Sequence, residues 1–184
     1  MSTYIAFLRG INVGGKNIIK MDELKSIFES FRFKNVETYI QSGNVIFETS
    51  TTNKKTLTQK IEKGLNKELG YEVATFLRTK EEMRALVKYD PFKNIKASDK
   101  AKTYVTFLQQ TSEVLRSTSE VLRKRAPLFS PKKDVEVIGV RECDVFCLAH
   151  QVNGSFGFPN IFLEKELKML ATTRNWTTVC KMAE

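Results

Sequence analysis

The stretch VETYIQSGNVIFET, residues 36–49, contains two β-rich segments on either side of a short polar break. Residues 36–41 and 45–49 predict strands, and Ser42-Gly43-Asn44 separates them. Because Gly and Asn tolerate positive φ, these three residues predict a tight hairpin turn. The hairpin is the centre of a larger pattern that extends in both directions along the chain.

The segments around this hairpin predict a strand and a helix on each side. Residues 3–9 (TYIAFLR) and 71–78 are β-rich, whereas residues 21–31 and 54–69 repeat apolar residues at helical spacing. The order is therefore β-α-β-β-α-β, which is typical of a ferredoxin-like, or split βαβ, plait. We expect six apolar residues of the two helices to lie in the core: Leu24, Ile27, Phe28, Leu57, Ile61 and Leu65.

A second half repeats this pattern. Thr79 to Glu82 matches a capping box and predicts a helix that ends near Tyr89. Asp90-Pro91 breaks the chain, and the polar residues 91–102 predict a linker. Beyond it we expect strands at 102–109, 134–139, 144–151 and 172–174, and helices at 112–125, 161–170 and 175–182. The fold class is therefore predicted as α+β, with two tandem α/β plaits at residues 1–92 and 93–184.

Two details of the second half follow from short motifs. Residues 112–118 and 119–125, SEVLRST and SEVLRKR, form a tandem heptad, which we interpret as a local duplication within one amphipathic helix. Asn175 precedes the last helical segment and is predicted to be its N-cap.

The composition excludes several classes of protein. No apolar run approaches the roughly 20 residues of a membrane span, and the N-terminus has no secretory signal pattern, so we expect a cytoplasmic protein. The cysteines, Cys143, Cys147 and Cys180, are odd in number and lack C-x-x-C spacing, which argues against disulfides and a metal site. The net charge of +9 favours an anionic partner, although it also fits a solvated basic surface.

The most distinctive motif is RGINVGGKN, residues 9–17. Its G-x-x-x-x-G-K spacing matches a phosphate loop until Asn17, which replaces the Mg²⁺-binding hydroxyl, and the next helix starts too late to aim its amides at a phosphate. The motif still offers three glycines for a nest of N–H groups, the charges of Arg9 and Lys16, and the amides of Asn12 and Asn17. It predicts either an anion-binding turn or a glycine-rich connection with solvated lysines.

Three separated motifs together resemble a known bacterial family, domain-of-unknown-function family 1697: LRGINVGGKNIIKMDEL, TYIQSGNVIF and TTRNWTTVCKM. The resemblance covers essentially the whole chain and implies paired α/β plaits. It implies no reaction, because the family has no established activity. Its signature falls on Arg9, Gly10, Asn12, Gly14, Gly15, Lys16, Ser42, Gly43, Asn44, Arg174, Asn175 and Trp176.

These polar turns suggest where a ligand binds. Near the C-terminus, Arg174 lies beside a predicted helix N-terminus, and Trp176 offers either a stacking face or a core side chain. We predict ligand contacts from Arg9, Asn12, Gly14, Gly15, Lys16, Asn17, Ser42, Asn44, Arg174, Asn175 and Trp176. No catalytic motif or cofactor site is evident.

Three hypotheses about function remain open from the sequence. The first is binding of an anionic partner, which is a phosphorylated small molecule, a nucleotide or a nucleic acid. The second is a small enzyme that acts on an anionic metabolite. The third is a structural or dimerising plait protein without a ligand. The sequence leaves the oligomeric state undetermined.

Overall fold

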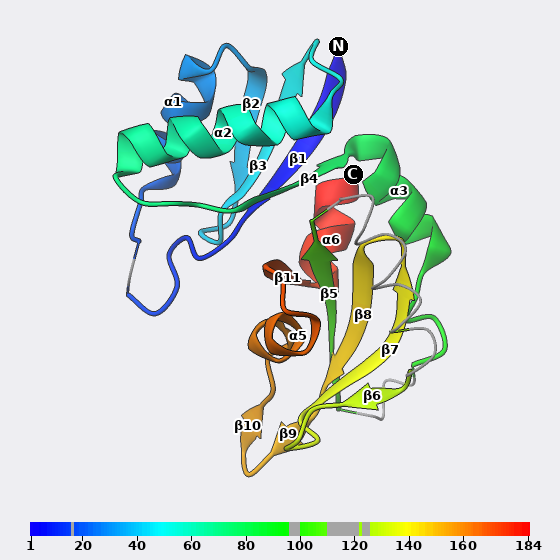
Figure 1. Ribbon diagram of the computed structural model, residues 1–184. Helices are drawn as coiled ribbons and strands as arrows, with labels where there is room; N and C mark the ends of the chain where they lie inside the picture. Colours follow the sequence, from blue (N-terminus) through cyan, green and yellow to red (C-terminus); the bar gives the residue numbers. More distant parts are fainter. Residues whose placement is uncertain (16, 96–99, 110–121, 123–125) are drawn as a thin grey trace. The chain divides into compact units, whose positions relative to one another are not determined.

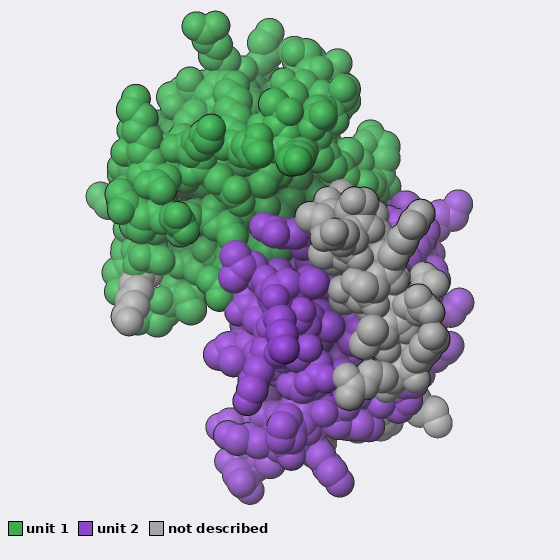
Figure 2. Space-filling view, in the orientation of Figure 1, with its two compact units in different colours: residues 1–84, 182–184 green, residues 85–181 purple. Residues whose placement is uncertain are grey.

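The structure is a computed structural model that describes residues 1–15, 17–95, 100–109, 122 and 126–184. The chain forms two compact units (Figure 2). Unit 1 comprises residues 1–84 and 182–184, and unit 2 comprises residues 85–181. The sequence-based boundary between residues 92 and 93 lies further along the chain than this division.

Unit 1 is built on a four-stranded antiparallel sheet with the order β2-β3-β1-β4 (Figure 1). Its strands are β1 (Ser2–Leu8), β2 (Lys34–Tyr39), β3 (Asn44–Thr49) and β4 (Thr75–Thr79). The helix α1 (Met21–Ser30) connects β1 to β2, α2 (Lys54–Leu69) connects β3 to β4, and α3 (Lys80–Tyr89) follows β4. The central hairpin is confirmed, but its turn comprises residues 40–43, and Asn44 already belongs to β3.

The helices α1 and α2 cover one face of this sheet (Figure 1). All six residues predicted to be core are buried between the helices and the strands: Leu24, Ile27, Phe28, Leu57, Ile61 and Leu65. Asn53 caps the start of α2, where its side chain accepts a hydrogen bond from the Thr56 N–H, and Gly70 caps the end of the helix with a φ of 78°. Helical periodicity therefore determines the buried face of this layer as the sequence predicts, and the caps of α2 are a further finding of the structure.

Unit 2 contains a five-stranded antiparallel sheet with the order β11-β5-β8-β7-β6. Its strands are β5 (Lys102–Leu108), β6 (Leu128–Phe129), β7 (Val135–Arg141), β8 (Asp144–Ala149) and β11 (Ala171–Asn175). A separate hairpin of β9 (Gln151–Val152) and β10 (Ser155–Phe156) precedes α5 (Pro159–Leu167), and α6 (Trp176–Ala183) ends the chain. The tandem heptad lies outside the described residues except for Leu122, which is buried.

The two units pair their strands in the same register. Phe7 of β1 lies opposite Asn44 of β3, and Phe107 of β5 lies opposite Asp144 of β8. The Leu8 N–H donates to Gly43 O over 2.8 Å, and the Leu108 N–H donates to Cys143 O over the same distance. Corresponding positions in the units can therefore be compared directly, one residue at a time.

The fold is thus mixed α/β with antiparallel sheets. Within the described part of the chain, no helix is both long enough and apolar enough to cross a membrane.

Candidate functional site

The glycine turn, residues 9–20, leads from β1 to α1 and is closed by its own asparagines. The Asn12 side chain donates to Ile19 O over 3.0 Å and accepts from the Ile19 N–H over 2.8 Å. The Asn17 side chain donates to Gly10 O over 3.2 Å, and the Asn12 N–H donates to Asn17 O. Both amides, which the sequence suggested as ligand donors, therefore hold the turn in shape.

The backbone of this turn is left-handed at several positions. Gly10, Asn12, Gly14, Gly15 and Asn17 have φ values of 76°, 55°, 59°, 73° and 52°. Gly14 and Gly15 are exposed, and within the described part of the chain their N–H groups donate no hydrogen bond. Peptide N–H groups in such turns can form an anion-binding concavity. The turn thus presents two adjacent donors on a backbone fixed by side-chain amides.

The glycine turn begins and ends with a basic residue, Arg9 and Lys20. Arg9 is half-buried where β1 ends, and its N–H donates to Ala74 O over 2.9 Å. Lys16, the other predicted cation, lies outside the described residues. The helix α1 begins at Met21, after the exposed Lys20. Because the helix N-terminus does not adjoin the G-K pair, the turn lacks the strand-loop-helix geometry of a Mg-nucleotide loop, as the sequence predicted.

The hairpin turn, residues 40–43, packs directly against the glycine turn. Gly43 is buried, and a Cβ atom added there would lie 3.0 Å from the Cβ atoms of both Ile11 and Leu8. The Asn44 side chain is fully buried and donates to Tyr39 O and to Ser42 Oγ. Ser42 and Asn44 therefore organise the hairpin turn, and the two turns form one rim at the end of the sheet.

The third predicted cluster, Arg174, Asn175 and Trp176, lies in unit 2 and has structural contacts. Arg174 is buried and donates to Thr172 Oγ1 and Thr173 O, and burial lowers its pKa to about 10. The Asn175 side chain accepts from the Thr178 N–H over 2.8 Å, which confirms the predicted N-cap. Trp176 packs edge-on against Phe92 with ring centroids 5.2 Å apart.

Unit 1 has a buried arginine at the position that corresponds to Arg174 of unit 2. Tyr4 pairs with Thr79 in unit 1, and Tyr104 pairs with Asn175 in unit 2, so Arg78 corresponds to Arg174. Arg78 is also buried and donates to the carbonyl of the preceding residue. An arginine in the last strand of both units, before a capped helix, is therefore a feature of this fold element and points away from a ligand role for Arg174.

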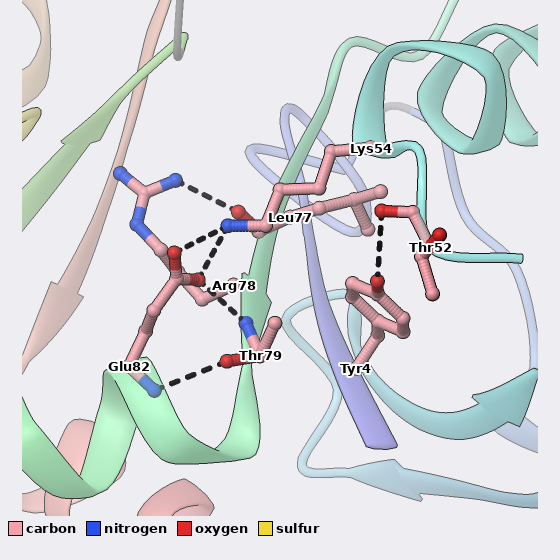
Figure 3. Close-up of polar contacts among 7 residues, drawn as sticks. All are labelled: Tyr4, Thr52, Lys54, Leu77, Arg78, Thr79 and Glu82. Atoms are coloured by element: carbon pink, nitrogen blue, oxygen red, sulfur yellow. Dashed lines mark hydrogen bonds and ion pairs between the residues drawn. The ribbon is translucent and has the colours of Figure 1, made fainter. Parts of the chain in front are cut away.

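A second polar cluster in unit 1 joins α2 to α3 (Figure 3). Lys54 Nζ lies 2.5 Å from both Glu82 carboxylate oxygens. The Thr79 N–H donates to Glu82 Oε2 and the Glu82 N–H donates to Thr79 Oγ1, which confirms the predicted capping box. Burial alone would raise the pKa of Glu82, but hydrogen bonds from Lys54 and Thr79 and the charges of Lys54 and Arg78 together lower it. The Glu82 carboxylate therefore accepts hydrogen bonds from Lys54 and Thr79 within the same unit.

We expect Glu82→Gln to lower the free energy of unfolding by about 1–2 kcal/mol near neutral pH, because charge-assisted hydrogen bonds at a half-exposed position are lost. The folded-state pKa of Glu82 lies below its usual value of 4.5, so this stability is present above that value and is lost as the pH falls through the folded pKa. Urea unfolding at several pH values measures it. Glu81→Gln, an exposed neighbour, is the control, and equal costs for both variants would contradict the assignment.

Comparison with known proteins agrees with this architecture. The family model described as "Protein of unknown function (DUF1697)" matches residues 1–135. The chain belongs to this family. A solved structure with a similar fold is that of the conserved bacterial protein SP0830 from Streptococcus pneumoniae, at 22% identity and a TM-score of 0.73. The match covers 99% of this chain and 97% of that chain. No curated protein sequence matches this chain.

Sequence reasoning missed one class of residue at the rim. Val13, Ile18 and Ile40 are exposed apolar side chains on the glycine turn and the hairpin turn. A window of hydrophobic periodicity cannot detect them, because they lie between the regular elements. Their one signal in the sequence is that aliphatic residues occur inside segments otherwise rich in Gly, Asn and Ser.

Proposed function

We propose that the glycine turn of unit 1 binds the anionic part of a phosphorylated ligand. The observation that carries the proposal is the pair of exposed N–H groups of Gly14 and Gly15, held by the side-chain amides of Asn12 and Asn17. A backbone that is fixed before binding loses little conformational entropy when the ligand arrives. Half-buried Arg9 and the sequence neighbour Lys16 supply positive charge at the turn.

Comparison of the two units supports a site in unit 1 alone. Asn44 of unit 1 corresponds to Asp144 of unit 2, and Arg9 corresponds to Gln109. Unit 2 thus has a carboxylate where unit 1 has an amide, and a neutral side chain where unit 1 has a cation. Such a charge pattern disfavours an anion at the equivalent end of unit 2.

The proposal also includes an interpretation of the fold of the two units. We interpret both units as ferredoxin-like plaits, supported in unit 1 by the strand order and by helices that connect β1 to β2 and β3 to β4. Plaits bind many classes of ligand, so the fold alone names none of them. The proposal of anion binding therefore rests on the glycine turn. No residue is assigned a catalytic role.

The proposal is tested with inorganic tripolyphosphate, because it contains only the anionic group. We expect calorimetry to detect binding to the parent protein and a loss of at least tenfold in affinity for Gly15→Ala. A Cβ at positive φ strains the turn and moves its N–H groups. Gly70→Ala is the matched control, because Gly70 has a φ of 78° and equally open surroundings at the end of α2.

Two outcomes would contradict the proposal. The first is the absence of tripolyphosphate binding by the parent protein at low ionic strength. The second is equal affinity in Gly15→Ala, Gly70→Ala and the parent, which would place any anion elsewhere on this basic protein. Lys16→Ala should weaken binding without changing the thermal stability, since its charge acts at the same turn.

A further inference from the structure

Three aliphatic side chains stand exposed on the rim of unit 1. Val13, Ile18 and Ile40 expose 64%, 76% and 49% of their surface. Val13 and Ile18 follow the two asparagines that close the glycine turn, and Ile40 begins the hairpin turn. Scattered apolar residues on a surface need no explanation, but these three lie on two turns that pack against each other, one of them rich in N–H donors, and this placement indicates a binding surface.

Besides being exposed, Ile40 has a backbone conformation that is unfavourable for the folded protein. Its φ is 48°, and a β-branched residue in the left-handed region is a strained outlier. Such strain costs on the order of 1–3 kcal/mol and concentrates at ligand-binding positions. Asn or Gly would adopt this conformation more easily, so the identity of residue 40 is not explained by the stability of the turn.

The repeat shows that the fold can close this hairpin with fewer residues. In unit 2, Arg141 pairs with Asp144, so residues 142–143 make the whole turn between β7 and β8. In unit 1, Tyr39 pairs with Asn44, so residues 40–43 make the turn between β2 and β3. Unit 1 therefore has a longer turn, and the exposed, strained Ile40 lies in it.

The longer turn is placed beside the proposed anion site. The Leu8 N–H donates to Gly43 O, and a Cβ atom added at Gly43 would lie 3.0 Å from the Cβ of Ile11. The hairpin turn and the glycine turn thus leave the same end of the β1-β3 pair (Figure 1). An apolar surface next to polar N–H donors is the combination that binds an organic group attached to an anion.

From these contacts we infer that the ligand of unit 1 is a nucleoside polyphosphate. The phosphates bind at the N–H groups of Gly14 and Gly15, and the nucleoside lies against the aliphatic side chains of Ile18 and Ile40. This inference rests on the proposed anion site. A single-stranded nucleic acid fits less well, because it is bound over several nucleotides by successive stacking faces along a positively charged groove, whereas this rim offers one small group of aliphatic side chains beside one turn.

The test compares ribonucleoside triphosphates with tripolyphosphate, without Mg²⁺ and at one ionic strength. These ligands share the anionic chain and differ by the nucleoside. We expect at least one nucleotide to bind the parent protein about tenfold more tightly than tripolyphosphate, the equivalent of about 1.4 kcal/mol. Ile40→Asn should remove most of this preference while tripolyphosphate binds as before.

Two further measurements distinguish the loss of a nucleoside contact from a loss of folding stability. The midpoint of thermal unfolding should stay unchanged or rise in Ile40→Asn, because Asn relieves the strain at positive φ. Ile161→Asn is the matched control: Ile161 is 76% exposed, like Ile18, but lies on α5 of unit 2. Its affinity for nucleotides should equal that of the parent protein.

The outcomes distinguish this inference from the proposed function. If tripolyphosphate binds and no nucleotide binds more tightly, or if Ile40→Asn keeps the full preference, the nucleoside contact is wrong and the anion site stands. An oligonucleotide that binds more tightly than any nucleotide, with a steep dependence on salt, would overturn the inference in favour of a nucleic acid. If neither tripolyphosphate nor nucleotides bind, the anion site itself is wrong.

Discussion

Replacing Phe47 by Ala is expected to lower the free energy of unfolding of unit 1 by about 3–5 kcal/mol, because a fully buried aromatic side chain is lost. The Phe47 ring stacks on Phe33 with centroids 4.4 Å apart and meets Phe28 edge-on at 5.6 Å. It therefore joins α1 and the sheet at the centre of the core. Urea unfolding followed by far-UV circular dichroism measures the change.

Phe129→Ala is the control for this prediction. Phe129 lies on β6 in unit 2 and is 46% exposed, so its loss should cost about 1 kcal/mol or less. Similar costs for the two variants would show that Phe47 does not occupy the centre of a packed core. The repeat adds a structural contrast, because the position in unit 2 that corresponds to Phe47 is Cys147. Unit 2 is thus packed without an aromatic ring at this point.

The helices of unit 1 and the existence of its four strands could be predicted from the sequence because each has a local signal, although β4 begins at Thr75 and not at residue 71. The stripe of Leu57, Ile61 and Leu65 determines the buried face of α2, and the capping box of Thr79 and Glu82 determines the start of α3. These signals act over a few residues and do not depend on the rest of the fold. Hydrophobic periodicity was therefore sufficient for this layer.

The short strands of unit 2 could not be predicted in this way. β6, β9 and β10 have two residues each, which is too few for any periodicity. The β6 strand pairs with the longer β7 at the edge of the five-stranded sheet, whereas β9 and β10 pair with each other in a separate hairpin. Each therefore depends on a strand partner rather than on a pattern of its own.

The roles of the polar residues were the least predictable part of the candidate site. Asn12 and Asn17 occur where a ligand donor is plausible, yet each amide completes a hydrogen bond within the turn. Arg174 suggested a phosphate contact, but its side chain is buried and its guanidinium donates to Thr172 and Thr173. A sequence does not show which polar groups the backbone itself requires, because that depends on the path of the chain in three dimensions.

The last expected result concerns the contact between the two turns. Gly43→Ala should destabilise the protein by about 1–3 kcal/mol more than Gly154→Ala, because it adds overpacking to backbone strain. Both glycines have positive φ, 68° and 80°, so each substitution has a conformational cost of about 1–2 kcal/mol. Only at Gly43 would the new Cβ also lie 3.0 Å from the Cβ atoms of Leu8 and Ile11, whereas the surroundings of Gly154 are open.

Gly43→Ala and Gly154→Ala also test whether packing between the two turns supports the proposed anion site. Because the Cβ atoms of Leu8 and Ile11 are attached directly to the backbone, the glycine turn has to shift when Gly43 becomes Ala. Tripolyphosphate affinity should therefore fall in Gly43→Ala and stay unchanged in Gly154→Ala, and chemical denaturation with calorimetry measures both effects. Equal stability losses in the two variants would show that the hairpin turn does not hold the glycine turn. A large stability loss in Gly43→Ala with unchanged affinity, measured well below its unfolding midpoint, would instead show that the anion site does not depend on that support.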